Sequence, residues 1–397
     1  MSQTDEAKDA VRHDTVAHPM SAVFSMTLCV AMLIASEFMP VSLLTPMAEG
    51  LGATAGQTGQ AVSVSGLFAV AASLLTATVA GRIDRKIVLL VMTTLMLVSL
   101  VMVALAPNFA VLMTARALLG ITIGGFWSLA TAVLMRLVAP AKVPQALAIM
   151  YTGQALAAAF AAPIGSYLGG LIGWRGVFWV LVPLVVINLF WQAIALPALP
   201  ARSRLTFSNL LGVLFRPYFL RALGAIVFTW GSAFTMFTYL RPFLEGVTGV
   251  GVTTLSILLL VLGCAGFIGT WLAGRLAGDH VGRLLVAPPL VMGAVTLGLL
   301  AFGHSLVLVA VLLAVWGAMN TAVSIIWMAW LSQNVDDAPE AAGSLMVAAI
   351  QASILLGALI GGLLLDAFGI GATFAGSIVM ALAAILFVGS GRSLLKH

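Results

Sequence analysis

The sequence predicts an all-α polytopic membrane protein with twelve transmembrane helices in two six-helix bundles. Three observations lead to this prediction. The 397 residues are 62% hydrophobic and only 8% charged, whereas a soluble domain has about 25% charged residues. The apolar residues form continuous runs long enough to cross a bilayer as helices, about 20 residues each. These runs also fall into two halves that repeat one another.

The apolar runs define the spans and the domain boundaries. Because they are continuously apolar, they do not fit a β-barrel, whose strands alternate between polar and apolar residues. We predict a tail at 1–20, a first bundle at 21–196, a central loop at 197–217, a second bundle at 218–391 and a tail at 392–397. The predicted spans are 21–47, 58–80, 87–106, 109–138, 145–172, 176–196, 218–244, 251–277, 284–303, 305–333, 341–367 and 371–390.

The basic residues predict the orientation of the chain. With a cytoplasmic N-terminus, fifteen of the eighteen lysines and arginines fall in cytoplasmic segments, as the positive-inside rule requires. We therefore expect a multi-pass membrane protein with both termini in the cytoplasm. The fifteen residues are Lys8, Arg12, Arg82, Arg85, Lys86, Arg136, Lys142, Arg202, Arg204, Arg216, Arg221, Arg275, Arg283, Arg392 and Lys396.

The two halves carry matching motifs and matching stripes of small residues. The second span is followed by Gly81-Arg82-Ile83-Asp84, and the eighth by Gly274-Arg275-Leu276-Ala277-Gly278-Asp279. Small residues recur every fourth position in spans five and eleven, at Gly153, Ala157, Ala161, Gly165 and Gly169 and at Ala349, Ser353, Gly357 and Gly361. One such stripe can simply pack helices, but packing alone does not require a repeat. Repeats of this kind are typical of two-bundle transporters.

Two charged residues lie deep in apolar spans. Arg116 is in span four, where an arginine costs about 2.5–3.5 kcal/mol by insertion scales. Gly120 and Gly124 follow on the same helical face, and small residues at this spacing let another helix approach closely. Glu37 in span one lies at a similar depth. We therefore predict that Glu37 and Arg116 form the energetic centre of a proton-coupled carrier.

Both charged residues have simpler interpretations that the sequence leaves open. Glu37 could form a structural ion pair, or it could bond to backbone that Pro40 leaves without a donor. Arg116 could extend towards the outer interface. A carboxylate between apolar surroundings and an arginine can also exchange a proton in the physiological range, and this is the interpretation that predicts coupling.

Several segments resemble a known family. Asp84-Arg85, Arg116–Gly125 and Ala162-Pro163-Ile164-Gly165 resemble three signature motifs of the major facilitator superfamily, in its twelve-helix drug/proton antiporter branch. The third motif is characteristic of the proton-driven antiporters. Four segments look like those of bacterial purine ribonucleoside efflux permeases, namely Ala22–Gly52, Gly125–Pro140, Ala162–Phe178 and Phe237–Pro242. This resemblance implies a location in the bacterial inner membrane. Sugar exporters of the same branch are similar, but less close around Ser36-Glu37-Phe38.

The resemblance implies roles for the motif residues. Asp84 and Arg85 would help to latch the cytoplasmic side of an outward-facing carrier, with Asp279 in the second copy of the motif. The first copy departs from the family pattern, because its loop is shortened to Asp84-Arg85-Lys86. Pro163 and Gly165 would bend span five and dispose the carrier to antiport.

The expected function is proton-driven export of purine ribonucleosides of the inosine and guanosine type. Sugar (arabinose-like) export, multidrug export and a non-transporting receptor with the carrier fold remain alternatives. We expect no enzyme activity, no metal and no cofactor beyond the proton gradient. The sequence has no Gly-x-x-x-x-Gly-Lys-Ser/Thr loop for ATP. The expected partners are a nucleoside, protons and the lipid bilayer, without nucleic acid, and the expected state is a monomer.

The substrate-site candidates are polar and aromatic residues in spans that line a central cavity. Aromatic faces stack on purine rings, and amides pair with their edges. The candidates are Tyr151, Gln154, Trp230, Thr235, Tyr239, Asn320, Ser324, Trp327 and Gln351.

Overall fold

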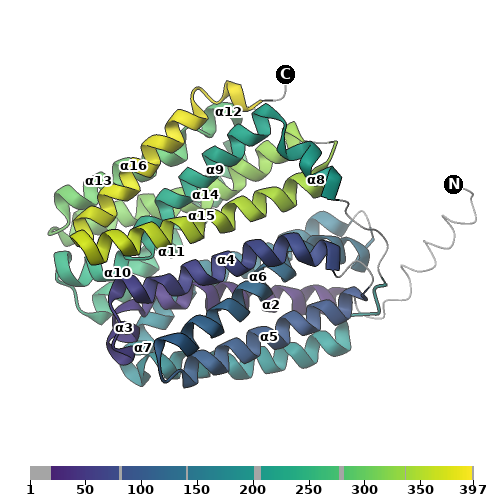
Figure 1. Ribbon diagram of the computed structural model, residues 1–397, viewed down its shortest axis with the longest axis horizontal. Helices are drawn as coiled ribbons and strands as arrows, with labels where there is room; N and C mark the ends of the chain where they lie inside the picture. Colours follow the sequence, from purple (N-terminus) through teal and green to yellow (C-terminus); the bar gives the residue numbers. More distant parts are fainter. Residues whose placement is uncertain are drawn as a thin grey trace, which may run out of the picture.

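The chain folds into helices that lie side by side in two bundles (Figure 1). The computed structural model describes residues 19–79, 83–139, 142–200, 207–276, 281–335 and 337–395. Eleven of the described helices are long and apolar enough to cross a membrane. One of these, α7, contains two of the predicted spans, so the described helices match the twelve-helix prediction.

The N-terminal bundle consists of α2 to α7, and the C-terminal bundle of α9 to α16. The first bundle contains α2 (Pro19–Ser42), α3 (Leu44–Leu51), α4 (Ala55–Val79), α5 (Arg85–Leu105), α6 (Phe109–Leu137) and α7 (Val143–Ala195). A short helix, α8 (Phe207–Leu214), leads into the second bundle. The second bundle contains α9 (Pro217–Phe237), α10 (Leu240–Phe243), a π-helical turn (Leu244–Thr248), α11 (Val252–Leu276), α12 (Val281–Leu284), α13 (Ala287–Phe302), α14 (Leu306–Asn334), α15 (Pro339–Phe368), α16 (Ile370–Val388) and a 3₁₀ turn (Arg392–Leu394).

Glycines with positive φ break the helices at corresponding places in the two bundles. Gly173 (φ 74°, ψ 161°) interrupts α7, and Gly369 (φ 83°, ψ 177°) separates α15 from α16. This backbone region is open only to glycine. The two residues are 196 positions apart, so the repeat seen in the sequence is also a repeat of backbone conformation.

The bundles meet along two helix pairs. Helix α4 runs beside α15 (Figure 1), and the first half of α7 packs against α11. We call the end that holds Pro19 and the 3₁₀ turn the terminal end, and the end that holds α3 and α10 the distal end. In Figure 1 the distal end is on the left.

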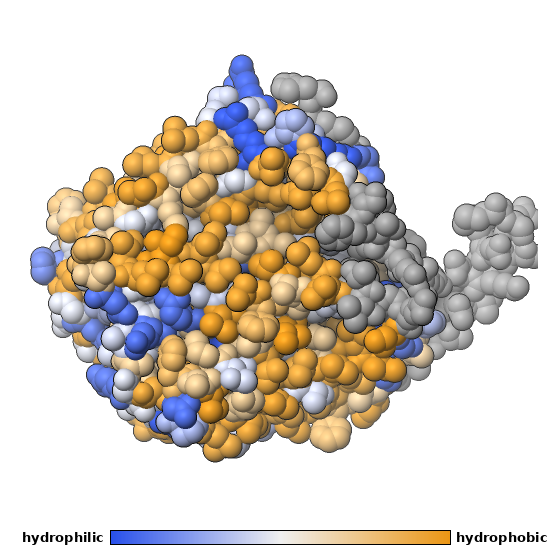
Figure 2. Space-filling model, viewed as in Figure 1, coloured by the Kyte–Doolittle hydropathy of each residue, from blue (hydrophilic) through white to orange (hydrophobic). Residues whose placement is uncertain are grey.

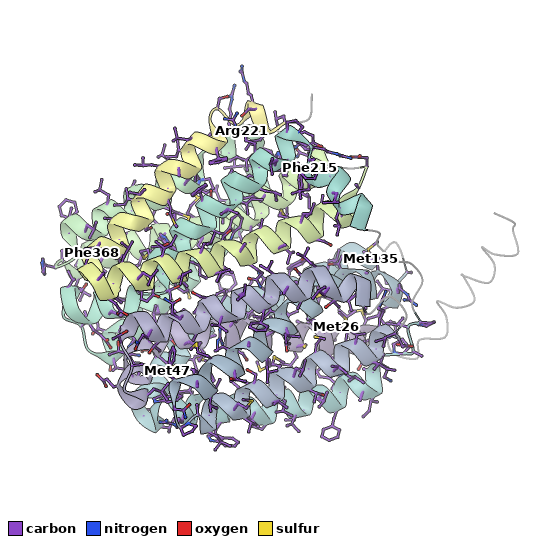
Figure 3. All side chains as sticks on the ribbon, in the orientation of Figure 1. Met26, Met47, Met135, Phe215, Arg221 and Phe368 are labelled. Atoms are coloured by element: carbon purple, nitrogen blue, oxygen red, sulfur yellow. The ribbon has the colours of Figure 1, made fainter. Side chains whose placement is uncertain are left out.

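The outward surface is apolar, as a bilayer requires. Orange residues cover most of the face in Figure 2, and large apolar side chains such as Ile194 and Phe368 are 85% and 77% exposed. Phe368 points away from the bundles in Figure 3. Helices suit such surroundings because every interior backbone donor and acceptor is paired within the helix. Hydrophilic residues gather at the distal end, where Thr54, Gln57 and Asp366 are exposed.

Candidate functional site

Arg116 joins three helices of the N-terminal bundle. It lies on α6, and its side chain is buried with 1% exposure. Its Nε donates to the Ala61 carbonyl on α4 at 3.0 Å, and Nη1 donates to the Ser36 carbonyl on α2 at 2.8 Å. Its Nη2 donates to the Glu37 carbonyl at 3.1 Å and to the Ser65 hydroxyl at 2.9 Å. The guanidinium therefore bonds to uncharged acceptors on α2 and α4.

Pro40 explains why Arg116 bonds to this part of α2. In a regular helix, the Ser36 carbonyl would accept from the backbone N–H four residues later, but that residue is Pro40, which has no N–H. Arg116 supplies the missing donor. Arg116 thus bonds to the carbonyl that Pro40 leaves free, in the role that one interpretation of the sequence gives to Glu37.

The Glu37 side chain faces the other bundle. It is buried with 5% exposure. The charge of Arg116 acts on its carboxyl group, and the Gln351 side chain on α15 lies within hydrogen-bonding reach of it. The described residues form two salt bridges, Arg216–Asp337 and Arg241–Glu245, so Glu37 and Arg116 are near one another without a direct salt bridge.

Beside Glu37, an aromatic cluster crosses the interface between the bundles. Phe38 of α2 stacks on Phe234 of α9 at 5.8 Å between centroids and meets Phe237 edge-on at 6.2 Å. Phe237 in turn stacks on Trp316 of α14 at 5.4 Å. The Trp316 indole N–H is buried without a partner. These four residues were not among the sequence candidates, although Phe38 directly follows Glu37 in the chain.

The sequence candidates for substrate binding occupy different places. Gln351 lies beside Glu37 at the interface. Thr235 of α9 and Tyr239, which directly precedes α10, instead bond to α15: their hydroxyls donate to the carbonyls of Gly357 (3.1 Å) and Ala358 (2.7 Å).

The remaining candidates lie in the core of the C-terminal bundle or are partly exposed. Trp230 and Trp327 belong to its hydrophobic core, where Trp327 meets Trp330 edge-on. Tyr151 on α7 is 38% exposed and stacks on Trp127 at 5.9 Å. Gln154, Asn320 and Ser324 are half-buried. A substrate role for each of these residues stays a prediction.

The residues of the loop motif after α4 form hydrogen bonds within the N-terminal bundle and the segment that follows it. The Asp84 carboxylate accepts from the backbone N–H of Lys86 at 2.8 Å, which caps α5, and from that of Leu199 at 3.0 Å. The Arg85 N–H donates to the Leu199 carbonyl at 2.9 Å. These bonds tie the start of α5 to the segment after α7. Asp279, the predicted counterpart in the second half, lies outside the described residues.

The small residues of the motifs sit where helices approach most closely. A Cβ at Gly120 would clash with the Ser65 carbonyl of α4, and one at Gly124 with the Ala69 carbonyl. Gly165, two residues after Pro163 in α7, faces Met39 of α2. Larger residues at these glycines would push the helices apart.

Polar contacts join the two bundles at the distal end. Arg241 of α10 donates to the Ser42 carbonyl and pairs with Glu245 at 2.8 Å. Glu245 in turn accepts from the Thr45 hydroxyl of α3 at 2.6 Å.

Asp366 makes a second distal connection. It lies in the last turn of α15 and reaches across to the N-terminus of α4. There it accepts from the Thr54 hydroxyl at 2.7 Å and the Gly56 N–H at 3.1 Å. A carboxylate is favoured at this position because helix N-termini carry free N–H groups and partial positive charge.

At the terminal end, Arg216 and Asp337 connect parts of the same bundle. Arg216 donates to Asp337 at 2.9 and 2.6 Å. These hydrogen bonds raise the pKa of Arg216 above its ordinary value, so this arginine stays charged. The bundles are thus tied together at the distal end, while this pair stabilises the C-terminal bundle alone.

Two repeated helical bundles, joined by paired helices around a buried charge, define a membrane carrier. The family model described as Major Facilitator Superfamily matches residues 26–349. The chain therefore belongs to this superfamily and is a multi-pass membrane transporter.

Two kinds of relative carry different names. The chain is 46% identical over 379 residues to "Transcription regulatory protein OpdE" of Pseudomonas aeruginosa, covering 94% of each chain. It is 37% identical over 360 residues to "Purine ribonucleoside efflux pump NepI" of Salmonella paratyphi B and of Salmonella enteritidis, covering 90% of this chain and 91% of each relative.

Solved structures share the fold. A bacterial homologue of the human lysosomal transporter Spinster, inward-facing and unoccupied, superposes with a TM-score of 0.75 at 15% identity, covering 95% of this chain and 98% of the other. The inward-facing, occupied form of that protein gives a TM-score of 0.66 at 14% identity, covering 94% and 95%.

Proposed function

We propose that the protein is a proton-driven antiporter that exports purine ribonucleosides of the inosine and guanosine type by alternating access. The observation that carries this proposal is the position of Glu37. Its carboxyl group is buried where the bundles meet and faces Gln351 of the opposite bundle. A proton or a substrate bound there would therefore interact with both bundles.

The bonding of Arg116 supports a proton-exchanging role for Glu37. Arg116 bonds to three carbonyls and one hydroxyl, so its hydrogen bonds do not depend on whether Glu37 carries a proton. Its positive charge favours the ionised form of Glu37, and burial favours the neutral form. Glu37 can then gain and lose a proton without breaking the packing of α2, α4 and α6.

The distal contacts support an assignment of the conformation. With the termini in the cytoplasm, the distal end faces outwards, and its contacts through Arg241 and Asp366 close the outer side. The structure then corresponds to an inward-facing carrier. Each proton that enters contributes about 2.3 kcal/mol per 100 mV of membrane potential, which sustains a tenfold or greater substrate gradient.

The substrate class rests on likeness to the NepI efflux pumps and on the chemistry at the interface. Gln351 offers an amide to a base edge or a ribose hydroxyl, and Phe38, Phe237 and Trp316 offer aromatic faces. Sugar or multidrug export would use the same mechanism with different occupants.

A second candidate function comes from the relative named OpdE. Its name is that of a transcription regulatory protein, and it is 46% identical to this chain. A membrane receptor with the carrier fold would bind a ligand and change conformation without net transport. The test below therefore measures flux and binding separately.

The test is inosine uptake into respiring everted vesicles, in which uptake corresponds to export. We expect the native protein to accumulate inosine and an uncoupler to abolish the accumulation. Glu37→Gln should lose accumulation at least tenfold while still exchanging inosine across the membrane. Glu49→Gln, an exposed carboxylate of α3, is the matched control and should transport normally.

Other results would redirect the proposal. Accumulation of a pentose or a dye without inosine would keep the antiport mechanism and replace the substrate. Inosine binding without any flux would favour the receptor. Normal accumulation by Glu37→Gln would show that the proton path runs elsewhere.

A further inference from the structure

A group of four polar residues is buried inside the N-terminal bundle, in addition to the site described above. The Thr93 hydroxyl of α5 donates to Gln192 Oε1 of α7 at 2.8 Å and lies 3.5 Å from the Cys29 sulfur of α2. Asn188 precedes Gln192 by one helical turn, so the two amides share a face of α7. All four side chains are fully buried, with 0% exposure. The group therefore brings polar side chains of three helices together.

Three polar atoms of the two amides are unpaired. Within the part of the chain that the structure describes, Nδ2 and Oδ1 of Asn188 and Nε2 of Gln192 have no hydrogen-bond partner. Amides buried in this way lose the hydrogen bonds that they would make in water, and proteins rarely leave that loss uncompensated. The two amides share a helix face without bonding to each other. Polar groups arranged in this way are commonly bridged by another molecule.

The corresponding place in the C-terminal bundle is apolar. With the offset of 196 residues between the halves, Asn188 corresponds to Ala384 of α16. Gln192 corresponds to Val388 at the end of the same helix, and both counterparts are fully buried. The repeated fold therefore packs with apolar residues at these positions, so amides are not needed there to fill space. Polar side chains within a membrane span are costly and commonly serve a function.

We propose that Asn188 and Gln192, with Thr93 and Cys29 beside them, form a binding site for an internal water molecule between α2, α5 and α7. Water can accept from the two amide N–H groups and donate to Asn188 Oδ1, and its second hydrogen can bond to the Cys29 sulfur, a weak acceptor. Internal waters make about three hydrogen bonds to buried polar groups that are otherwise unpaired. A cation would meet N–H donors, and an anion would meet Asn188 Oδ1, so a neutral ligand fits these atoms better.

The experiment follows the Cys29 thiol by infrared spectroscopy of the protein in lipid vesicles. Cys264→Ala, at an exposed position, leaves Cys29 as the one cysteine of the chain. The S–H stretching band is lost when the thiol exchanges its hydrogen with D₂O, and an internal water that trades places with bulk water carries deuterium to the thiol. Asn188→Leu removes two of the three free atoms and keeps the bond between Thr93 and Gln192. We expect this variant to exchange at least tenfold more slowly than the Cys264→Ala protein.

Controls and a second measurement keep the test decisive. Gln145→Leu, at an exposed glutamine of α7, should leave the exchange rate unchanged, and Asn188→Ala replaces Asn188→Leu if the latter does not fold. A high-resolution density map of the unchanged protein should show one peak within hydrogen-bonding distance of Asn188 and Gln192. Equal or faster exchange in Asn188→Leu, amides bonded directly to each other, or a peak that requires added sodium or potassium would each overturn the inference. Neither measurement involves inosine or a proton gradient, so the result is independent of the proposed function.

Discussion

The two bundles can be compared at the contact between their second and fourth spans. In the N-terminal bundle, Gly120 of α6 meets the Ser65 carbonyl of α4; in the C-terminal bundle, Gly317 of α14 meets the Leu262 carbonyl of α11. Both pairs of positions are 197 residues apart. Four residues before each glycine, however, one bundle has Arg116 and the other has Leu313, which is fully buried.

A similar difference separates α2 from α9. The turn of α9 that corresponds to Glu37 carries Ala233 and Phe234, both buried. One bundle therefore holds a buried arginine and a buried carboxyl group, and the other has an apolar and aromatic surface in the same place. The repeat teaches that equivalent backbone packing does not require equivalent chemistry.

Replacing Arg116 by leucine would give the N-terminal bundle the chemistry of its counterpart, and we expect the largest effect here. The variant loses four hydrogen bonds and leaves the Ser36 carbonyl without a donor. Unfolding in mixed micelles should become easier by about 3–5 kcal/mol, and gradient-driven uptake should be lost. Arg283→Leu, at an exposed site, should stay within about 0.5 kcal/mol. A loss below 1 kcal/mol for Arg116→Leu would contradict the bonding described here.

Alanine at the two equivalent glycines tests whether the packing is truly shared. In Gly120→Ala and Gly317→Ala the new Cβ would clash with a backbone carbonyl, which cannot rotate away as a side chain can. We expect each variant to lose about 1–3 kcal/mol of stability in the same unfolding assay. Gly343→Ala, with no atom within 4 Å of its Cβ, should gain up to about 1 kcal/mol. Loss in only one of the pair would show that the bundles pack differently.

The contact that Asp366 makes between the bundles at the distal end gives a smaller test of the difference between them. Asp366 of α15 caps α4 of the other bundle. At Gly170 of α7, 196 positions earlier, a Cβ would instead lie 3.0 Å from the Val252 side chain at the start of α11. Asp366→Ala should weaken distal closure by about 0.5–2 kcal/mol, the range for loss of a helix cap.

Spin labels at exposed Pro107 and Thr253, one in each bundle, report this closure as a distance distribution. A change of 1 kcal/mol alters the ratio of closed to open molecules about fivefold. Glu49→Ala removes a distal charge without crossing the interface and should leave the distribution as it is. An identical distribution in Asp366→Ala would mean that the cap does not hold the bundles together.

Much of the membrane architecture can be read from local pattern. The twelve spans follow from apolar runs, since each helix satisfies its own backbone in lipid. Gly173 and Gly369 lie at the ends of the fifth and eleventh spans, where the backbone has a positive φ that excludes other residues. The nearness of Glu37 and Arg116 also follows from their similar depth, once the order of the spans around the bundle is assumed.

Which residues far apart in the sequence contact one another depends instead on how the helices pack. Arg116 bonds to the Ser36 carbonyl, 80 residues earlier, which Pro40 leaves without a donor. Asp366 caps a helix of the other bundle. Gln351 faces Glu37, and Trp316 joins the aromatic cluster through Phe237. Hydropathy and periodicity tell which residues are buried in lipid or protein, because burial depends on each residue's own transfer free energy. They do not tell which buried groups meet, since that depends on the rotation and crossing of helices that only close packing sets.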